Sequence, residues 1–194
     1  GWGDLAAFGG RDASNTLRSD LFYTTHTYAS DGTPNYVWHR AAVDGAIPAA
    51  REKSALAFNS DHTRLYLVGG RDGTNTYDDV HWYDLVAQKW MLTSLSAALP
   101  ARFDASVAVR NDTLYVGGGA TTAGAILGDL WRIDGVTGEV TGYGNALPLG
   151  ASPSLSFDDH GDGLVYGGGY YGSTWYADVW TVRFPATGDP ARPG

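Results

Sequence analysis

The residues best suited to chemistry in this sequence are acidic and histidine side chains, which can hold a cation or transfer a proton. Residues 158–163 contain three Asp, one His and two Gly and are similar at first sight to a calcium-binding loop. An EF-hand also needs a later Glu and flanking helices, and neither is present. We therefore interpret this segment as a turn between strands. The five His, at positions 26, 39, 62, 81 and 160, show no metal-ligand spacing, so the sequence predicts no metal and no cofactor.

Signatures of catalysis are equally scarce. The chain has no Gly-x-Ser-x-Gly motif and no Gly-rich loop followed by Lys and Ser or Thr. It has no Cys, which excludes disulfides, thiol catalysis and Cys-based zinc sites. Asp12 and Asp72 are the acid or base candidates, but no second group is identifiable, and Asp is a poor acid at neutral pH unless its pKa is raised. The prediction is a non-enzymatic protein, and an enzyme using one of these Asp residues remains an alternative.

Composition excludes further classes of partner. The formal net charge is −8, with 13 Lys and Arg against 21 Asp and Glu, whereas nucleic-acid binders usually show a basic stripe. No apolar run approaches the ~20 residues that a membrane-spanning helix needs, and no signal peptide is visible at the start. Hydrophobic residues make up 43% of the chain, enough for a packed core. We expect no nucleic acid and no membrane insertion, and the compartment stays unassigned.

The elements that position these side chains come from one repeated pattern. An apolar run such as 65–68 ends in a Gly pair, where another backbone comes close or φ is positive. An Asp followed by Leu or Val opens the next apolar strand. The Gly pairs begin at residues 9, 69, 118 and 168, so successive spacings are 60, 49 and 50 residues. Repeats of about 50 residues with strand content are typical of propeller arrays. The Asp residues are Asp20, Asp79, Asp129 and Asp178, and we interpret them as structural acceptors of backbone N–H groups.

This pattern resembles the kelch motif: an apolar run, Gly-Gly, a variable loop, Asp-Leu/Val, and then Trp. The segments GGRDASNT and GGRDGTNT, from residues 9 and 69, match at six of eight positions. Pro-Ala-Ala-Arg at 48–51 and Pro-Ala-Arg at 100–102 precede the next repeats, whereas Pro-Leu-Gly at 148–150 lacks the Arg. The resemblance implies an all-β, kelch-type β-propeller of about four blades. We expect one domain over 1–194, with blades near 5–40, 51–93, 102–143 and 151–185 and a tail at 186–194.

The expected strands leave both end blades incomplete. Lettering the strands of a blade a to d outward from the axis, the first blade begins at strand b (5–8), followed by c (20–23) and d (36–38). The connection 24–35 is expected to be an insertion that lengthens the first spacing. The last blade has strands at 154–157, 164–166 and 178–184, and its strand d should begin at 190. We therefore expect a segment or incomplete ring of a larger propeller, completed by flanking blades or another chain. A self-contained four-bladed ring is the alternative.

Because strands alternate in direction, the b–c loops and the d–a connections share one face, which is the expected binding face. The loop 170–176 is rich in aromatic residues, which suit protein or glycan contact, although one or two could pack under the rim. The resemblance implies that Arg residues near this face bind acidic peptides, although each Arg could instead pair with a loop Asp or a neighbouring blade. The candidate binding residues are Arg11, Arg51, Arg71, Asp72, Tyr77, Arg102, Tyr170, Tyr171, Trp175 and Tyr176.

The sequence thus favours a protein-interaction or scaffold module that belongs to a larger protein or assembly. A glycan-binding propeller that uses the aromatic loop is the second hypothesis, and a kelch-type enzyme with an unidentified site is the third.

Overall fold

A computed structural model describes residues 2–158 and 163–183. These residues form sixteen β-strands and no helix. The turn expected at 158–163 falls mostly outside the described residues, as do residue 184 of the expected strand 178–184 and the last strand, expected from residue 190. None of the described elements is a helix long and apolar enough to cross a membrane.

The strands form four antiparallel sheets and one short hairpin, and the sheets follow one another along the chain. The two central sheets have four strands each, and the first and last have three. The first sheet contains β1 (Trp2–Phe8), β2 (Leu21–Tyr28) and β3 (Pro34–Arg40). The second contains β4 (Ala55–Phe58), β5 (Arg64–Val68), β6 (Val80–Asp84) and β7 (Lys89–Leu92). The third contains β8 (Ser106–Arg110), β9 (Thr113–Gly117), β10 (Leu130–Asp134) and β11 (Val140–Gly142). The fourth contains β12 (Ser154–Phe157), β13 (Gly163–Gly167) and β16 (Val179–Arg183), and β14 (Tyr170–Tyr171) pairs with β15 (Thr174–Trp175).

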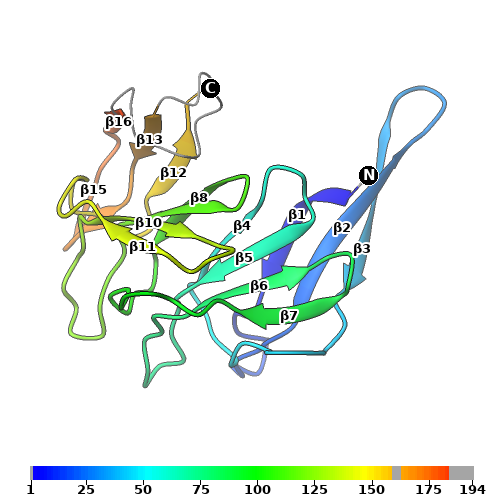
Figure 1. The fold of residues 1–194 in the computed structure, drawn as a ribbon, viewed down its shortest axis with the longest axis horizontal. Helices are drawn as coiled ribbons and strands as arrows, with labels where there is room; N and C mark the ends of the chain where they lie inside the picture. The colour runs from blue at the N-terminus through cyan, green and yellow to red at the C-terminus, as the bar shows by residue number, and fades with distance from the viewer. Residues whose placement is uncertain (1, 159–162, 184–194) are drawn as a thin grey trace.

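The sheets are arranged as consecutive propeller blades in an open arc (Figure 1). The innermost strands β4, β8 and β12 are neighbours across the blades. Strand order within each blade is sequential from inside to outside, as the repeat predicted. In the described residues no hydrogen-bonded sheet joins the first blade to the last. The described residues therefore form an all-β propeller arc in which the first and last sheets do not pair.

The hydrophobic core lies between the blades rather than inside any one of them. Side chains alternate along each central strand, so the two faces of a sheet pack against different neighbours. In β5, Leu65 and Leu67 contact the first blade beside Trp90, whereas Tyr66 and Val68 contact the third blade. Tyr115 of β9 likewise faces the fourth blade. All of these side chains are at most 2% exposed, which explains why the apolar runs show no polar alternation.

The Gly pairs hold each blade against the connection to the next one. The first Gly of each pair has positive φ, for example +61° at Gly69. A Cβ at Gly69 would lie 2.4 Å from the carbonyl oxygen of Arg102. The N–H of Gly70 donates to that same carbonyl at 2.8 Å. Both predicted reasons for the Gly pair, positive φ and close backbone approach, therefore hold together.

The expected insertion at 24–35 is largely strand, which corrects the prediction of a connecting loop. β2 continues to Tyr28 and β3 already begins at Pro34, and these two residues are partners in the register. The hairpin projects away from the body of the molecule (Figure 1). Its extension exposes aromatic residues such as Tyr28, at 68%. Cross-strand pairing with β3 continues the sheet beyond the blade, and the repeat pattern carries no information about such an extension.

Candidate functional site

The b–c loops and d–a connections lie together on one face, here called the loop face. Isolated bridges join Glu52 to Arg71, Phe103 to Ala120, and Ala151 to Tyr170. In each pair the first residue belongs to a d–a connection and the second follows a Gly pair. The predicted side-by-side placement of these two kinds of loop is therefore present in blades two, three and four.

Arg51 and Arg102 lie beneath this face and not on it. They are 1% and 0% exposed. The two Nη atoms of Arg102 donate to the Oδ atoms of Asp129 at 2.8 and 2.7 Å, and Nη1 also donates to the Gly118 carbonyl at 3.1 Å. Its Nε donates to the Pro100 carbonyl at 3.0 Å. Their assignment as binding residues is therefore wrong, because both side chains are buried and all three guanidinium nitrogens of each already donate to groups inside the blade.

Arg51 makes the same set of contacts in blade two. Its Nη atoms donate to Asp79 at 2.5 and 2.8 Å, Nη1 also donates to Gly69 O at 3.0 Å, and Nε donates to Ala49 O at 3.0 Å. The guanidinium lies 3.7 Å from the centroid of the Tyr77 ring. We call this set of acceptors the arginine socket: the strand-c Asp, the carbonyl of the first paired Gly, and the carbonyl two residues before the Arg.

Three of the four repeating Asp residues are structural, but their main partners are arginines rather than the expected backbone N–H groups: Asp20, Asp79 and Asp129. Burial alone would raise the pKa of Asp79, yet hydrogen bonds from Arg51 and His81 outweigh it and lower the pKa to about 2. Burial would also raise the pKa of Asp129, but the hydrogen bond and the positive charge of Arg102 outweigh it and lower that pKa. Both carboxylates therefore remain ionised at neutral pH, paired with a buried cation.

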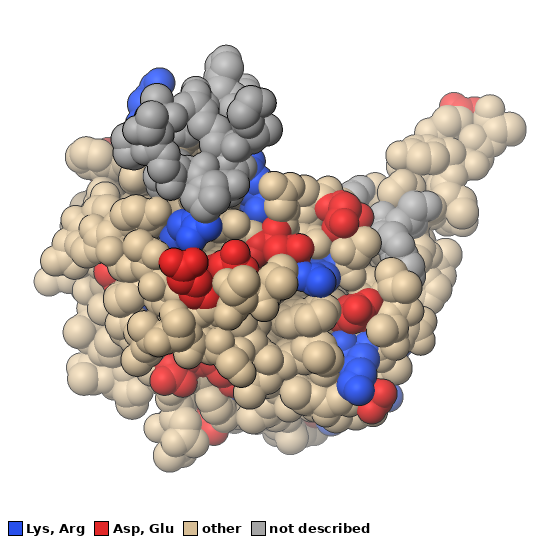
Figure 2. Space-filling view, in the orientation of Figure 1, with Lys and Arg blue, Asp and Glu red and all other residues tan. Residues whose placement is uncertain are grey.

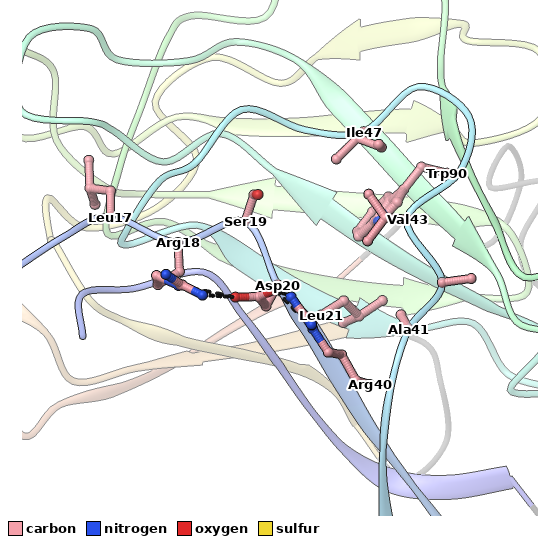
Figure 3. A pocket seen from close by; sticks show the side chains of 11 residues that line it. Leu17, Arg18, Ser19, Asp20, Leu21, Arg40, Ala41, Val43, Ile47 and Trp90 are labelled. Carbon is pink, nitrogen blue, oxygen red and sulfur yellow. Dashed lines mark hydrogen bonds and ion pairs between the residues drawn. The ribbon is translucent and has the colours of Figure 1, made fainter. Parts of the chain in front are cut away.

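In blade one, the Asp before strand c also pairs with arginines, but these come from other positions in the chain (Figure 3). Asp20 accepts hydrogen bonds from Arg40, which comes from the neighbouring β3, and from Arg18 at 3.1 Å. The hydrogen bond from Arg40 is the largest influence and lowers the pKa of Asp20. These groups line a pocket of about 320 Å³ whose apolar side includes Ile47 and Trp90. Both arginines are substantially exposed there.

On the loop face itself, Arg11 and Arg71 share one acidic partner. The Nε of Arg11 lies 2.9 Å from Glu52, and the Nε of Arg71 lies 3.4 Å from the other carboxylate oxygen. The guanidinium of Arg71 also lies 4.3 Å from the centre of the Phe103 ring. The side chains of both arginines are about one-third exposed, so they can still meet a partner. Sequence reasoning missed Glu52, because the equivalent positions in the other blades are apolar and no repeat signal marks it.

Asp72 and Tyr77 hold their loop in shape. Asp72 Oδ1 accepts the backbone N–H groups of Thr74 and Asn75 at 2.8 and 2.7 Å. The Tyr77 hydroxyl donates to Asp72 Oδ2 at 2.8 Å. The hydrogen bonds led by Asn75 hold the pKa of Asp72 well below its usual range. An ionised carboxylate is no general acid, and Asp12 also binds its own loop, by accepting the N–H groups of Ser14 and Thr16.

The aromatic loop 170–176 folds as the small β14–β15 hairpin at the edge of the loop face. Tyr171, Trp175 and Tyr176 are 47%, 77% and 42% exposed. Tyr170 is half-buried and packs against Phe103, Ala120 and Ala151. The hairpin therefore presents three aromatic side chains to solvent, and one packs under the rim.

In the view of Figure 2 and among the described residues, neither a patch of one charge nor a metal site stands out. Acidic and basic side chains are interspersed on the side of the molecule seen in Figure 2. Among residues 2–158 and 163–183, no group of three or more His, Asp or Glu is placed to hold a metal ion.

Repeated antiparallel blades, Gly pairs at the blade junctions and buried Arg–Asp pairs together define the class of protein, a β-propeller of the kelch type. A family model described as the KLHDC2/KLHL20/DRC7 Kelch-repeats domain matches residues 3–187. The chain therefore belongs to the kelch-repeat family. It is also similar to the Rab9 effector protein with kelch motifs of Homo sapiens, at 32% identity over 94 residues. That match covers 45% of this chain and 25% of the relative, so the chain spans about a quarter of that protein's length.

Proposed function

We propose that this chain is part of a protein-binding module that contacts its partner through the loop face. Kelch-repeat domains generally bind other proteins, and the human relative is named as an effector protein of Rab9. With 32% identity over less than half of the chain, the relative supports the class of partner and not its identity. The blades supply a rigid platform, since their cores are continuous from one blade to the next.

The single observation that carries this proposal is the exposed β14–β15 hairpin. Trp175 is 77% exposed, with its ring 5.3 Å from that of Tyr170. Aromatic side chains provide a large contact area at a low cost in conformational entropy and dominate many protein interfaces. Arg11 and Arg71 on the same face, each with a side chain about one-third exposed, add cations that can contact carboxylates at the rim of such an interface.

Site-specific photo-crosslinking tests the proposed face. A photoreactive phenylalanine analogue placed at Trp175 should crosslink a discrete protein from cell extract. The matched control carries the same analogue at Val136, which is 64% exposed but lies in a c–d turn on the opposite face. Equal crosslinking from both positions, or crosslinking from Val136 alone, would contradict the loop-face assignment.

A direct measurement follows once the crosslinked protein is identified. Trp175→Ala should weaken its binding by about ten- to a hundredfold, the usual range for an aromatic residue central to an interface. An unchanged affinity would exclude the hairpin from the contact.

The same hairpin also supports the second candidate, a glycan-binding site, because an exposed Trp can stack on a sugar ring. A glycan array read with the wild type and with Trp175→Ala separates the two functions. Saturable glycan binding that disappears in the variant would favour the glycan hypothesis over a protein partner.

A further inference from the structure

Blade four retains the arginine socket but lacks the arginine. Gly150 occupies the position of Arg51 and Arg102, because its carbonyl accepts the N–H of Gly119 at 2.8 Å, as theirs accept those of Gly10 and Gly70. Asp178 is the counterpart of Asp79 and Asp129, since its carbonyl accepts the Gly168 N–H at 3.1 Å. The backbone therefore places a strand-c Asp and a Gly carbonyl in the usual positions, with no side chain at residue 150 to reach them.

Tyr166 takes over only one part of the missing arginine's role. Its hydroxyl donates to the Pro148 carbonyl at 3.1 Å, the acceptor that corresponds to those of the Arg51 and Arg102 Nε atoms. A Cβ on Gly150 would lie 2.9 Å from this hydroxyl, so the tyrosine lies where an arginine side chain would begin. Asp178 receives nothing equivalent: among the described residues no ion pair to its carboxylate is found, and the residue is exposed.

The remainder of the socket is an open pocket of about 350 Å³. Asp178 and Gly168 line it together with Tyr166, Tyr171, Tyr176 and Trp180. Tyr176 is the counterpart of Tyr77, since the N–H of each donates to the carbonyl of the second Gly of its pair, at 3.0 and 2.9 Å. The Tyr77 ring is the surface on which the Arg51 guanidinium stacks.

We propose that this blade-four socket binds an arginine side chain of a partner protein, reproducing between molecules the Arg–Asp contact that blades two and three make internally. The proposal rests on the protein-binding function and names the chemistry of its ligand. A guanidinium suits the site because it can donate two parallel hydrogen bonds to Asp178 while its plane stacks on an aromatic ring. Lysine offers neither the planar fork nor the stacking face, so it should bind more weakly.

The first test uses the peptide acetyl-Gly-Arg-Gly-amide and its citrulline counterpart, which is neutral but similar in shape. Binding is followed by NMR shifts of the tryptophan indole groups. We expect saturable binding with a dissociation constant on the order of millimolar, as suits so small a ligand. The citrulline peptide should bind at least tenfold more weakly, and equal affinities for the two peptides would overturn the proposal.

Variants of the socket locate the site. Asp178→Asn should reduce the affinity for the arginine peptide at least tenfold without lowering the melting temperature, because Asp178 is exposed. Asp31→Asn, an exposed carboxylate in the β2–β3 hairpin, is the matched control and should leave affinity unchanged. Equal losses in both variants would show a nonspecific charge effect and overturn the assignment.

A second variant does not depend on removing the carboxylate. Gly150→Arg combined with Tyr166→Leu restores the arrangement of blade two, where Arg51 is paired with Asp79 and Leu67 holds the position of Tyr166. The φ angle of Gly150 is outside the left-handed region, so the backbone accepts the change. This variant should no longer bind the peptide, and retained affinity would refute the equivalence of the sockets.

The outcomes also separate this inference from the proposed function. If the arginine peptide does not bind but Trp175 still crosslinks a protein, only the socket proposal is refuted. If the peptide binds but Trp175 crosslinks no protein, only the loop-face assignment is refuted.

Discussion

Replacing Arg102 by Met tests whether the buried Arg–Asp pair stabilises the blade. Methionine keeps much of the apolar stem but removes four donor contacts, two of them to Asp129. The side chain of Asp129 is 13% exposed and that of Arg102 is 0% exposed, so the carboxylate would be left nearly dry and without its cation. Breaking a buried pair by removing one partner costs about 3–5 kcal/mol. In a chain of this length that corresponds to a fall in melting temperature of about 6–20 °C.

The matched control is Arg11→Met, which removes the same side chain from an ion pair at the surface. Arg11 and Glu52 have side chains 32% and 20% exposed, and pairs of this kind contribute about 0–1 kcal/mol. Urea denaturation of the wild type and both variants, monitored by tryptophan fluorescence, measures the two losses under one condition. A loss for Arg102→Met within about 1 kcal/mol of the control would refute the argument that burial makes this pair structural.

Arg102→Lys refines the result, because lysine retains the positive charge but not the two parallel donors. We expect a loss between those of Arg102→Met and the wild type. A lysine variant as stable as the wild type would show that charge alone, without the forked geometry, holds Asp129.

Three further predictions concern pH, backbone and surface. The pKa of Asp79 is lowered to about 2 from an ordinary 3.8, which implies about 2 kcal/mol of stability. This stability is present above about pH 4 and is lost as pH falls towards 2. Urea denaturation should show the difference in unfolding free energy between the wild type and Asp79→Asn shrinking over that range, and a constant difference would contradict the prediction. Gly69→Ala should lower the unfolding free energy by about 1–3 kcal/mol more than Gly124→Ala does. Both glycines have positive φ, but only a Cβ at residue 69 would meet a backbone carbonyl, at 2.4 Å. Equal losses of unfolding free energy in urea denaturation would exclude that contact. Trp175→Ala should change the unfolding free energy by no more than about 0.5 kcal/mol, since the residue is 77% exposed; a larger loss would show a structural role.

Much of the architecture could be predicted because it depends on local patterns. Apolar runs followed by Gly pairs locate strand b, since a buried strand must end where only Gly can adopt the required φ and allow another backbone to approach. The Asp before each strand c, repeated at similar spacing, likewise locates the third strand. Each of these local patterns is a weak indication alone, but their repetition four times along the chain predicts a specific architecture, the propeller. The β2–β3 hairpin escaped prediction because it occurs once, and its length depends on pairing between two strands rather than on the repeat.

The candidate site was predicted less well, and Arg51 shows why. Surface exposure is the usual state of an arginine, and nothing in its immediate sequence indicates that Asp79, 28 residues later, neutralises it inside the blade. The sequence by itself determined the fold class, the repeat and the aromatic composition of the loop at 170–176. Only the tertiary structure decided which arginines are exposed, that Tyr171, Trp175 and Tyr176 are exposed while Tyr170 is half-buried, and that Asp178 lines an open pocket. Exposure and pairing are set by contacts between segments far apart in the chain, which local patterns do not encode.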